Sequence, residues 1–550
     1  MTNESITSQT PRSATSTLYR GGFVYSPADP SATAMVVEDN QIAWIGSDEA
    51  AARHADGIDA VVDLDGALVT PAFVDAHAHT SATGMGLRSV DLTDVRSAKE
   101  ALTRIEDAAR RRQGRPVYAP GWDEDDWPEH RPHTAAELDR AAYGGVVYSP
   151  RVDGHSAVIS SALAAASGVR NLPGWNDSGL VTREAHHAAR ETFREGISTA
   201  DRRADIDAAL KAAAAAGIGL VHENGGPELS SEADFVDVLS AGKRGDGPQV
   251  IGYWAELVAD EESARALAGR LGARGIGGDL NIDGSIGSRT ASLRAPYLDG
   301  LDGPGGYDGH EGLDSAGCGN AYLTVEQVRD HVAACSMAGI QAGFHVIGDA
   351  GADTVIAGFQ AAAQQVGTAR VVAARHRLEH LEMVDVAGIK ALAELGVTAS
   401  VQPAFDAFWG GLDGMYAARL GRERVTGMNP FATMAANGMS LAFGSDTPVT
   451  PFAPWEAIRA AVFHHEQAQR ISAGTAFLAH TRGGWRAVGI DDRGYLDLGQ
   501  PATFAIWSLG NDDLHGTTRL PELAPGATPP ANLRTVIRGR TVFDLEGAFS

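Results

Sequence analysis

The sequence is poor in cysteine. Only Cys318 and Cys335 occur among 550 residues, and their separation does not match a C-x-x-C pair. This excludes a disulfide scaffold and a metal site built from thiolates. Such sparing use of cysteine fits a reducing compartment, so we predict a cytoplasmic protein.

Positive charge and long apolar runs are scarce as well. The chain has 45 Lys and Arg against 70 Asp and Glu, a net charge of -25, which repels phosphate backbones and argues against a nucleic-acid partner. No stretch approaches the roughly 20 apolar residues of a membrane span, and the N-terminus lacks the apolar core of a signal peptide. We therefore expect no membrane association, and a disordered polar tail at residues 1–16.

Two segments at opposite ends of the chain share one pattern. "LYRGGFVY" (18–25) and "VIRGRTVF" (536–543) each indicate a strand, an Arg-Gly turn and a second strand. Residues 34–46 alternate like a hairpin, and residues 501–509 form a further apolar strand. We predict one composite β-sandwich domain from residues 17–70 and 490–550. The alternative is two unrelated terminal hairpins.

Between these ends, short apolar strands alternate with helical patterns such as 205–217, 261–275 and 324–339. This alternation indicates an α/β fold with a parallel sheet, and eight strands predict a (β/α)8 TIM barrel over residues 71–489. The gap at about 85–205 is too long for one loop and predicts an inserted lobe. The expected strands are 72–79, 217–223, 250–257, 279–284, 340–347, 375–381, 397–403 and 439–446.

Histidine and aspartate stand at the C-terminal ends of several expected strands. In "PAFVDAHAH" (71–79), His77 and His79 are two positions apart and share a strand face. Alone, the pair could be only a polar tip on a buried strand. His345, His380 and Asp446 end three further strands, and such ends meet at the catalytic face of a barrel. Imidazole and carboxylate together suit a divalent ion such as zinc with one position open for water.

These motifs resemble the metal-site signature of the amidohydrolase superfamily. The similarity is closer to one branch, the N-substituted formamide deformylase-like or YtcJ-type hydrolases, and runs in order from about residue 18 to 545. The motifs of that branch are "GWDEDDW", "RVDGHSAV", "DGSIGSRTASL", "HVIGDAG", "RHRLEHLEMV", "SVQPAF" and "HTRGGWRAVG". The resemblance also implies a composite sandwich.

The resemblance implies a metal-dependent hydrolase that cleaves an amide- or formamide-type C–N bond, not a peptide bond, in a small molecule. Bound zinc makes hydroxide available near neutral pH. Asp446 is placed to accept the proton of the water and deliver it to the departing nitrogen. Either the metal or His380 would polarise the carbonyl. The sequence is also compatible with a homo-oligomer.

Asp279 departs from the family pattern. Four positions before the Asp of "DGS", the family typically has a lysine whose carboxylated side chain bridges two metals, and here that position is Asp279. An aspartate reaches roughly 5 Å less far from the same Cα. We therefore predict one tightly bound ion on His77, His79 and Asp446 with His345, while His380 turns toward water or substrate. A backbone difference, or a carboxylate such as Glu223, would restore a bridge.

Three alternatives stay open. A deaminase of the same superfamily would attack an amidine-like ring carbon with the same aspartate. Hydrolysis of an ester or lactone needs the same machinery. A barrel that binds metal without catalysis would retain the ligands but turn over no substrate.

Overall fold

The computed structural model describes residues 15–54, 57–124, 127–152, 156–227, 229–298, 317–509 and 519–549. The chain forms two compact units, one from the described residues up to His79 and from Leu210 onward, the other from Thr80–Ala209. Of the expected tail, residues 1–14 lie outside the described residues, and Ser16 already begins a strand. No helix in the described ranges is long and apolar enough to cross a membrane.

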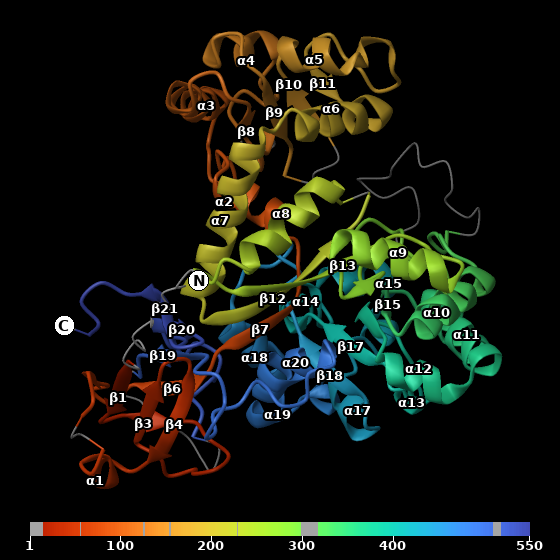
Figure 1. The fold of residues 1–550 in the computed structure, drawn as a ribbon. Helices are drawn as coiled ribbons and strands as arrows, with labels where there is room; N and C mark the ends of the chain where they lie inside the picture. Colours follow the sequence, from red (N-terminus) through yellow and green to blue (C-terminus); the bar gives the residue numbers. More distant parts are fainter. Residues whose placement is uncertain are drawn as a thin grey trace, which may run out of the picture. The chain divides into compact units, whose positions relative to one another are not determined.

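An eight-stranded sheet forms the centre of the first unit, with helices packed around it (Figure 1). All seven strand pairings are parallel. Its first and last strands meet through a bridge between Ala78 and Thr447, so the predicted (β/α)8 barrel is confirmed. The strands, in sheet order from the last, are β18 (Ser440–Phe443), β17 (Thr398–Val401), β16 (Arg377–His380), β15 (Gln341–Val346), β14 (Gly275–Ile276), β13 (Gln249–Trp254), β12 (Ile218–Gly225) and β7 (Phe73–Ala78).

Helix α10 (Val325–Ala338) of this unit begins and ends at residues with recognisable capping chemistry. Thr324 forms a capping box with Gln327 at the start of α10, and Gly339 ends that helix in the left-handed region with φ of 69°. The helices are α8 (Glu232–Gly242), α9 (Glu261–Leu271), α10 (Val325–Ala338), α11 (Asp349–Val366), α12 (Thr368–Ala374), α13 (Val386–Glu394), α14 (Pro403–Trp409), α15 (Met415–Leu420), α16 (Arg422–Val425), α17 (Phe431–Ala436), α18 (Pro454–Val462), α19 (Ala473–Leu478) and α20 (Gly484–Ala487), with short turns at Gln467–Gln469 and Ala479–Gly483.

The fourth barrel strand is not where the sequence pattern placed it. The expected strand at 279–284 is wrong, because β14 covers only Gly275–Ile276. Gly277 and Gly278 then adopt φ of 120° and 72°, and a Cβ on Gly277 would lie 2.2 Å from the carbonyl oxygen of Gly343. The chain turns here as only glycine readily allows. Residues 279–284 therefore form a loop at the C-terminal face of the barrel, which keeps one parallel bridge to β15 between Asn281 and His345.

The chain termini build one sandwich of two sheets, as predicted. Sheet β4-β3-β1-β5 contains only N-terminal strands, whereas sheet β2-β6-β19-β20-β21 joins both ends of the chain through antiparallel pairing of β6 with β19. Tyr19, Met35, Phe504 and Val536 pack in the core between the sheets. The elements are β1 (Ser16–Arg20), β2 (Phe23–Val24), β3 (Ala34–Glu38), β4 (Gln41–Gly46), α1 (Asp48–Ala51), β5 (Ala60–Asp63), β6 (Leu68–Pro71), β19 (Phe504–Trp507), β20 (Asn532–Ile537) and β21 (Arg540–Asp544).

Deleting residues 490–550 is expected to yield insoluble protein. The deletion removes β19, β20 and β21, which leaves the edge of β6 unpaired and exposes the apolar face around Val69. The soluble fraction after expression is the measurement, and deletion of residues 1–14, which removes no described strand, is the control. A soluble and active truncated chain would contradict the composite sandwich.

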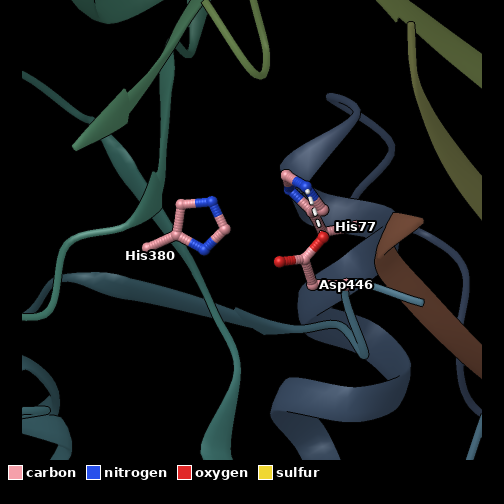
Figure 2. Close-up of side chains that lie close together, drawn as sticks. All are labelled: His77, His380 and Asp446. Carbon is pink, nitrogen blue, oxygen red and sulfur yellow. Dashed lines mark ion pairs between the residues drawn. The ribbon is translucent and has the colours of Figure 1, made fainter. Parts of the chain in front are cut away.

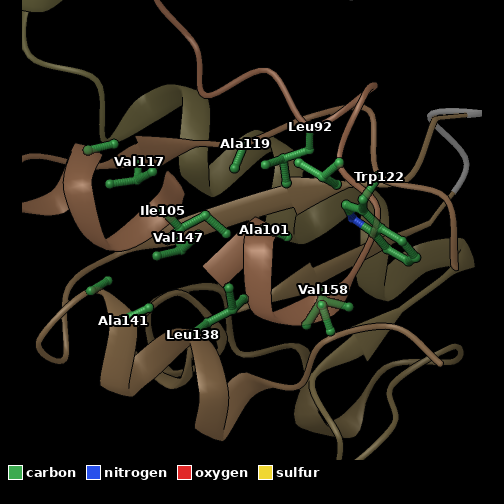
Figure 3. Packing of buried hydrophobic residues seen from close by; sticks show 14 of the residues in the cluster. Leu92, Ala101, Ile105, Val117, Ala119, Trp122, Leu138, Ala141, Val147 and Val158 are labelled. Atoms are coloured by element: carbon green, nitrogen blue, oxygen red, sulfur yellow. The ribbon is translucent and has the colours of Figure 1, made fainter. Parts of the chain in front are cut away.

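The second unit is the inserted lobe, which has a core of its own. Figure 3 shows Ile105, Val117, Trp122, Leu138 and Val147 packed together in it. Its four-stranded sheet has the order β11-β10-β9-β8. The elements are α2 (Thr80–Leu87), α3 (Ala98–Arg112), β8 (Val117–Tyr118), α4 (Ala135–Ala141), β9 (Val147–Pro150), β10 (Ala157–Ile159), α5 (Ser161–Ser167), a turn at Val169–Asn171, β11 (Leu180–Val181), α6 (Arg183–Glu195) and the first part of α7 (Thr199–Ala215).

Candidate metal centre

Four histidines and two aspartates gather at the C-terminal end of the barrel strands. His77 and His79 come from the end of β7, and His345 and His380 from β15 and β16. Asp446 follows β18, and Asp279 follows β14. Their ligand atoms form three groups, each within 4.8 Å: His77, His380 and Asp446; His77, His79 and Asp279; and Asp279, His345 and His380. The structure thus brings together all five predicted ligands and Asp279.

Asp446 faces the two histidines of β7. Its Oδ1 lies 3.4 Å from Nε2 of His77 and 3.1 Å from Nε2 of His79. Figure 2 shows the ring of His380 pointing toward the same space from the opposite side. Nε2 of His77 and Oδ1 of Asp446 are buried without a hydrogen bond of acceptable geometry. Buried polar atoms are rarely left so, and a cation between them would satisfy both.

Asp279 lies between the two histidine pairs. Its Oδ1 is 3.1 Å from Nδ1 of His345 and 3.4 Å from Nε2 of His380. The same carboxylate is 3.8 Å from Nε2 of His77 and 3.6 Å from Nε2 of His79. Two ligand atoms of one tetrahedral zinc ion are about 3.3 Å apart, given bonds of about 2.0 Å. The distances from the Asp279 carboxylate to the histidine nitrogens are therefore compatible with ligand atoms that bind the same zinc ion.

The expectation that Asp279 cannot reach the centre is wrong. The expectation compared Asp279 with a lysine at the same Cα position. In the structure the Asp279 carboxylate lies 3.1–3.8 Å from nitrogens of both histidine pairs. The reason for expecting a single ion no longer holds.

Hydrogen bonds fix which nitrogen each histidine presents. Nδ1 of His77, His79 and His380 lies 2.8 Å from Oε2 of Glu379, the carbonyl oxygen of Asn224 and Oε1 of Gln402, respectively. With Nδ1–H donated to these oxygens, each Nε2 faces the centre. His345 is reversed, since its Nε2 lies 3.1 Å from the carbonyl oxygen of Gly284 and its Nδ1 faces Asp279.

Two centre residues adopt backbone conformations that non-glycine residues rarely use. His380 has φ of 68° and Asp446 has φ of 56°. Such conformations cost on the order of 1–3 kcal/mol and persist where the surrounding structure requires them. His380 is the last residue of β16 and Asp446 follows β18, and at both positions the side chain points toward its partners in the centre. The strain is thus associated with the orientation of these side chains.

The electrostatics of the centre favour a cation. Burial by itself lowers the pKa of His77, but the carboxylates of Asp446 and Asp279 outweigh burial and hold that pKa well above its ordinary value. Burial also favours the neutral acid of Asp446, yet His77 and His79 outweigh it and lower its pKa. A histidine that is protonated in the metal-free protein, as the raised pKa of His77 indicates, releases a proton when a metal binds.

Some residues around the centre were not anticipated from the sequence, chiefly Glu379 and Gln402, which hold His77 and His380. Glu379 did leave a signal. Arg377 and Glu379 are opposite charges two positions apart in β16, a strand that is otherwise expected to be apolar because it is buried on both faces. Charged residues in such a strand indicate a buried pair with a specific task. Gln402 left no comparable signal.

Comparison with known proteins places the chain among hydrolases. Residues 60–543 match the model described as the amidohydrolase family. Protein LONG AFTER FAR-RED 3 of Arabidopsis thaliana is 27% identical, with 89% of this chain and 86% of that protein covered. The putative amidohydrolase YtcJ of Bacillus subtilis (strain 168) is 24% identical, covering 96% and 99%. The N-substituted formamide deformylase of Arthrobacter pascens is 23% identical, covering 78% and 80%.

A solved structure shows the same fold. An uncharacterized metal-dependent hydrolase from Pyrococcus furiosus superposes with a TM-score of 0.72 at 25% sequence identity. The similarity covers 89% of this chain and 98% of that one. The architecture of barrel and additional sheets is therefore one that is found in a metal-dependent hydrolase.

Proposed function

Because the chain belongs to the amidohydrolase family, we propose that it hydrolyses a non-peptide C–N bond of amide or formamide type in a small molecule. Hydrolase activity and a divalent metal follow from the family and from the metal-dependent hydrolase of similar structure. The resemblance to YtcJ-type hydrolases is confirmed. In addition to the C–N bond as the target, we propose zinc as the metal, the residue roles given below and a cytoplasmic location.

The observation that carries the proposal is the set of converging ligand atoms, among which Nε2 of His77 and Oδ1 of Asp446 are buried without a hydrogen bond. His77, His79, Asp279 and Asp446 would hold one ion, and Asp279 with the remaining two histidines of the centre would hold another. Nitrogen and oxygen donors suit zinc. A bound divalent ion would supply Lewis acidity and make water acidic enough to attack at neutral pH.

Asp446 is the residue we propose for proton transfer. Its carboxylate is buried and faces the centre. The paired histidines keep its pKa low, so it is ionised. From its position facing the centre it would accept the proton of the attacking water. It would then deliver that proton to the leaving nitrogen. An amine is a poor leaving group until it is protonated, so an amide makes full use of this transfer.

His380 is the residue we propose for the carbonyl oxygen. Gln402 holds its Nδ1 at 2.8 Å, so Nε2 is directed to the centre. Burial is the largest influence on the pKa of His380 and lowers it. The ring is therefore neutral, and it can act as a ligand or steady the developing oxyanion through a water molecule.

A substrate screen tests the proposed function. We expect metal-loaded protein to release amine and acid from N-formyl amines or other N-acyl amines, in keeping with a relative named N-substituted formamide deformylase. Cyclic amides, esters, lactones and amidine-like rings complete the panel, and the metal-free protein is the control. Ammonia release from rings alone would indicate a deaminase. Turnover of esters or lactones alone would indicate those hydrolases, and no turnover would favour a non-catalytic barrel.

A further inference from the structure

A wholly buried arginine lies inside the barrel next to the metal centre. Arg377 is 0% exposed. Its guanidinium donates to both carboxylate oxygens of Glu379, from Nε at 2.5 Å and from Nη2 at 3.0 Å. Nη2 also donates to the carbonyl oxygen of Ala76 at 2.5 Å and to Oγ of Ser400 at 2.8 Å. Arg377 therefore joins three different barrel strands.

Two further neighbours complete the surroundings of the guanidinium. Nη1 of Arg377 lies 3.0 Å from Nδ1 of His222, which accepts this hydrogen bond because the guanidinium can only donate. The charge also lies 4.3 Å from the ring centre of Tyr253, a favourable cation–π contact. A buried charge is costly unless it is paired and hydrogen-bonded in this way.

Glu379 connects Arg377 to the metal centre through hydrogen bonds. Its Oε2 lies 2.8 Å from Nδ1 of His77, and both side chains are fully buried. Arg377 already donates to both oxygens of the Glu379 carboxylate. This carboxylate then accepts a hydrogen bond from Nδ1–H of His77, which leaves Nε2 of His77 directed to the centre.

We propose that Arg377 and Glu379 are positioning residues that hold His77 in the tautomer and orientation required for binding metal. The inference rests on the metal centre of the proposed function. Arg377 supplies the fixed donors that keep the Glu379 carboxylate in place, and Glu379 then supplies the acceptor that directs the lone pair of Nε2 toward Asp446 and Asp279. Acceptors behind a metal-bound histidine act in this manner generally.

A purely structural role would have a different signature. If the pair only stabilised the barrel, breaking it would lower the melting temperature of the metal-free protein without changing the metal affinity of the molecules that remain folded. If the pair positions His77, metal affinity falls in folded protein. Metal affinity and metal-free stability must therefore be measured separately.

Glu379→Gln is the main test. An amide has one acceptor oxygen, whereas Glu379 offers two oxygens to three donors: Nε and Nη2 of Arg377 and Nδ1 of His77. One donor must then face the amide NH2. We expect zinc affinity, measured by competition with a chromophoric chelator, to fall about 10- to 100-fold. NMR of ¹⁵N-histidine in the zinc-bound protein should show a changed Nδ1–H signal for one histidine.

A second variant and a matched control make the test decisive. Glu379→Asp keeps the charge but shortens the side chain by one methylene, so it should fold, weaken zinc binding and thus decide the matter if Glu379→Gln fails to fold. Glu382→Gln is the control, since Glu382 is equally buried near the end of β16 but faces Asn429. We expect the control to bind zinc within about threefold of the parent.

The inference is overturned if the folded Glu379 variants bind zinc as tightly as the control, whatever their melting temperatures. Failure of the proposed function would look different. A parent protein that binds no zinc would overturn the metal centre itself, and this inference with it, before any variant is compared. A parent that binds zinc but hydrolyses none of the substrates would leave the result for Glu379 interpretable, because the readouts do not use activity.

Discussion

Asp446→Asn should lower kcat at least about a hundredfold while the fold and the metal content stay close to those of the parent. The carboxylate faces Nε2 of both His77 and His79, where it can take a proton from water and return it to the leaving group. Asparagine keeps the shape and one oxygen but cannot carry the proton, and such transfer contributes about 10²- to 10⁴-fold. Turnover, thermal melting and metal content are measured on the same preparations.

Asp406→Asn is a matched control for this experiment. Asp406 is also a buried aspartate paired with histidines, His464 and His465, but none of these belongs to the centre. We expect its kcat to stay within a few-fold of the parent. If Asp446→Asn were as active as this control, Asp446 would have no part in proton transfer. If it lost metal together with activity, its main role would be that of a ligand.

Asp279→Ala should remove at least one metal ion per chain. The carboxylate lies 3.1–3.8 Å from nitrogens of both histidine pairs, so it can neutralise part of the repulsion between two dications close together. We expect two ions per chain in protein purified without added metal, and at most one in the variant. Elemental analysis measures both, and activity should fall with the lost ion.

A different number of metal ions per chain would contradict the role of Asp279. One tightly bound ion in the parent and an unchanged ion in Asp279→Ala would restore the single-ion hypothesis, and Asp279 would then be only a neighbour of the centre. Asp406→Ala removes a buried carboxylate elsewhere in the same unit and should leave the metal content unchanged. Loss of metal in that control as well would point to general destabilisation.

The barrel and the ligand histidines could be predicted because their signals are local. A buried parallel strand is a short apolar run, and His345 stands near the end of one such run. His380 ends a neighbouring short strand. The fourth strand could not be predicted in this way. Residues 279–284 alternate like a strand, and Ile282 is indeed buried. The two glycines before them interrupt the strand, and the segment then makes a single parallel bridge to β15, between Asn281 and His345.

The residues that hold the ligand histidines in place were harder to predict, because they depend on contacts between different strands of the barrel. Glu379 contacts His77, which lies about 300 residues earlier in the chain, and Gln402 holds His380 from the end of the next strand. Periodicity shows which face a residue occupies but not which residue it meets there. The charges of Arg377 and Glu379 in a buried strand were a usable sign of this network, although they did not identify its partner.

The pairing of β6 with β19 also bears on synthesis of the protein in the cell. Roughly 430 residues separate the two strands, and at about 5–20 residues per second a ribosome needs roughly 20–90 s to make them. During this interval the edge of β6 stays unpaired because β19 has not yet been synthesised, while the barrel between the two strands can already fold. Chains released early would carry this open edge, so nonsense mutations late in the gene should cause aggregation and proteolysis even though every ligand of the metal centre has been made.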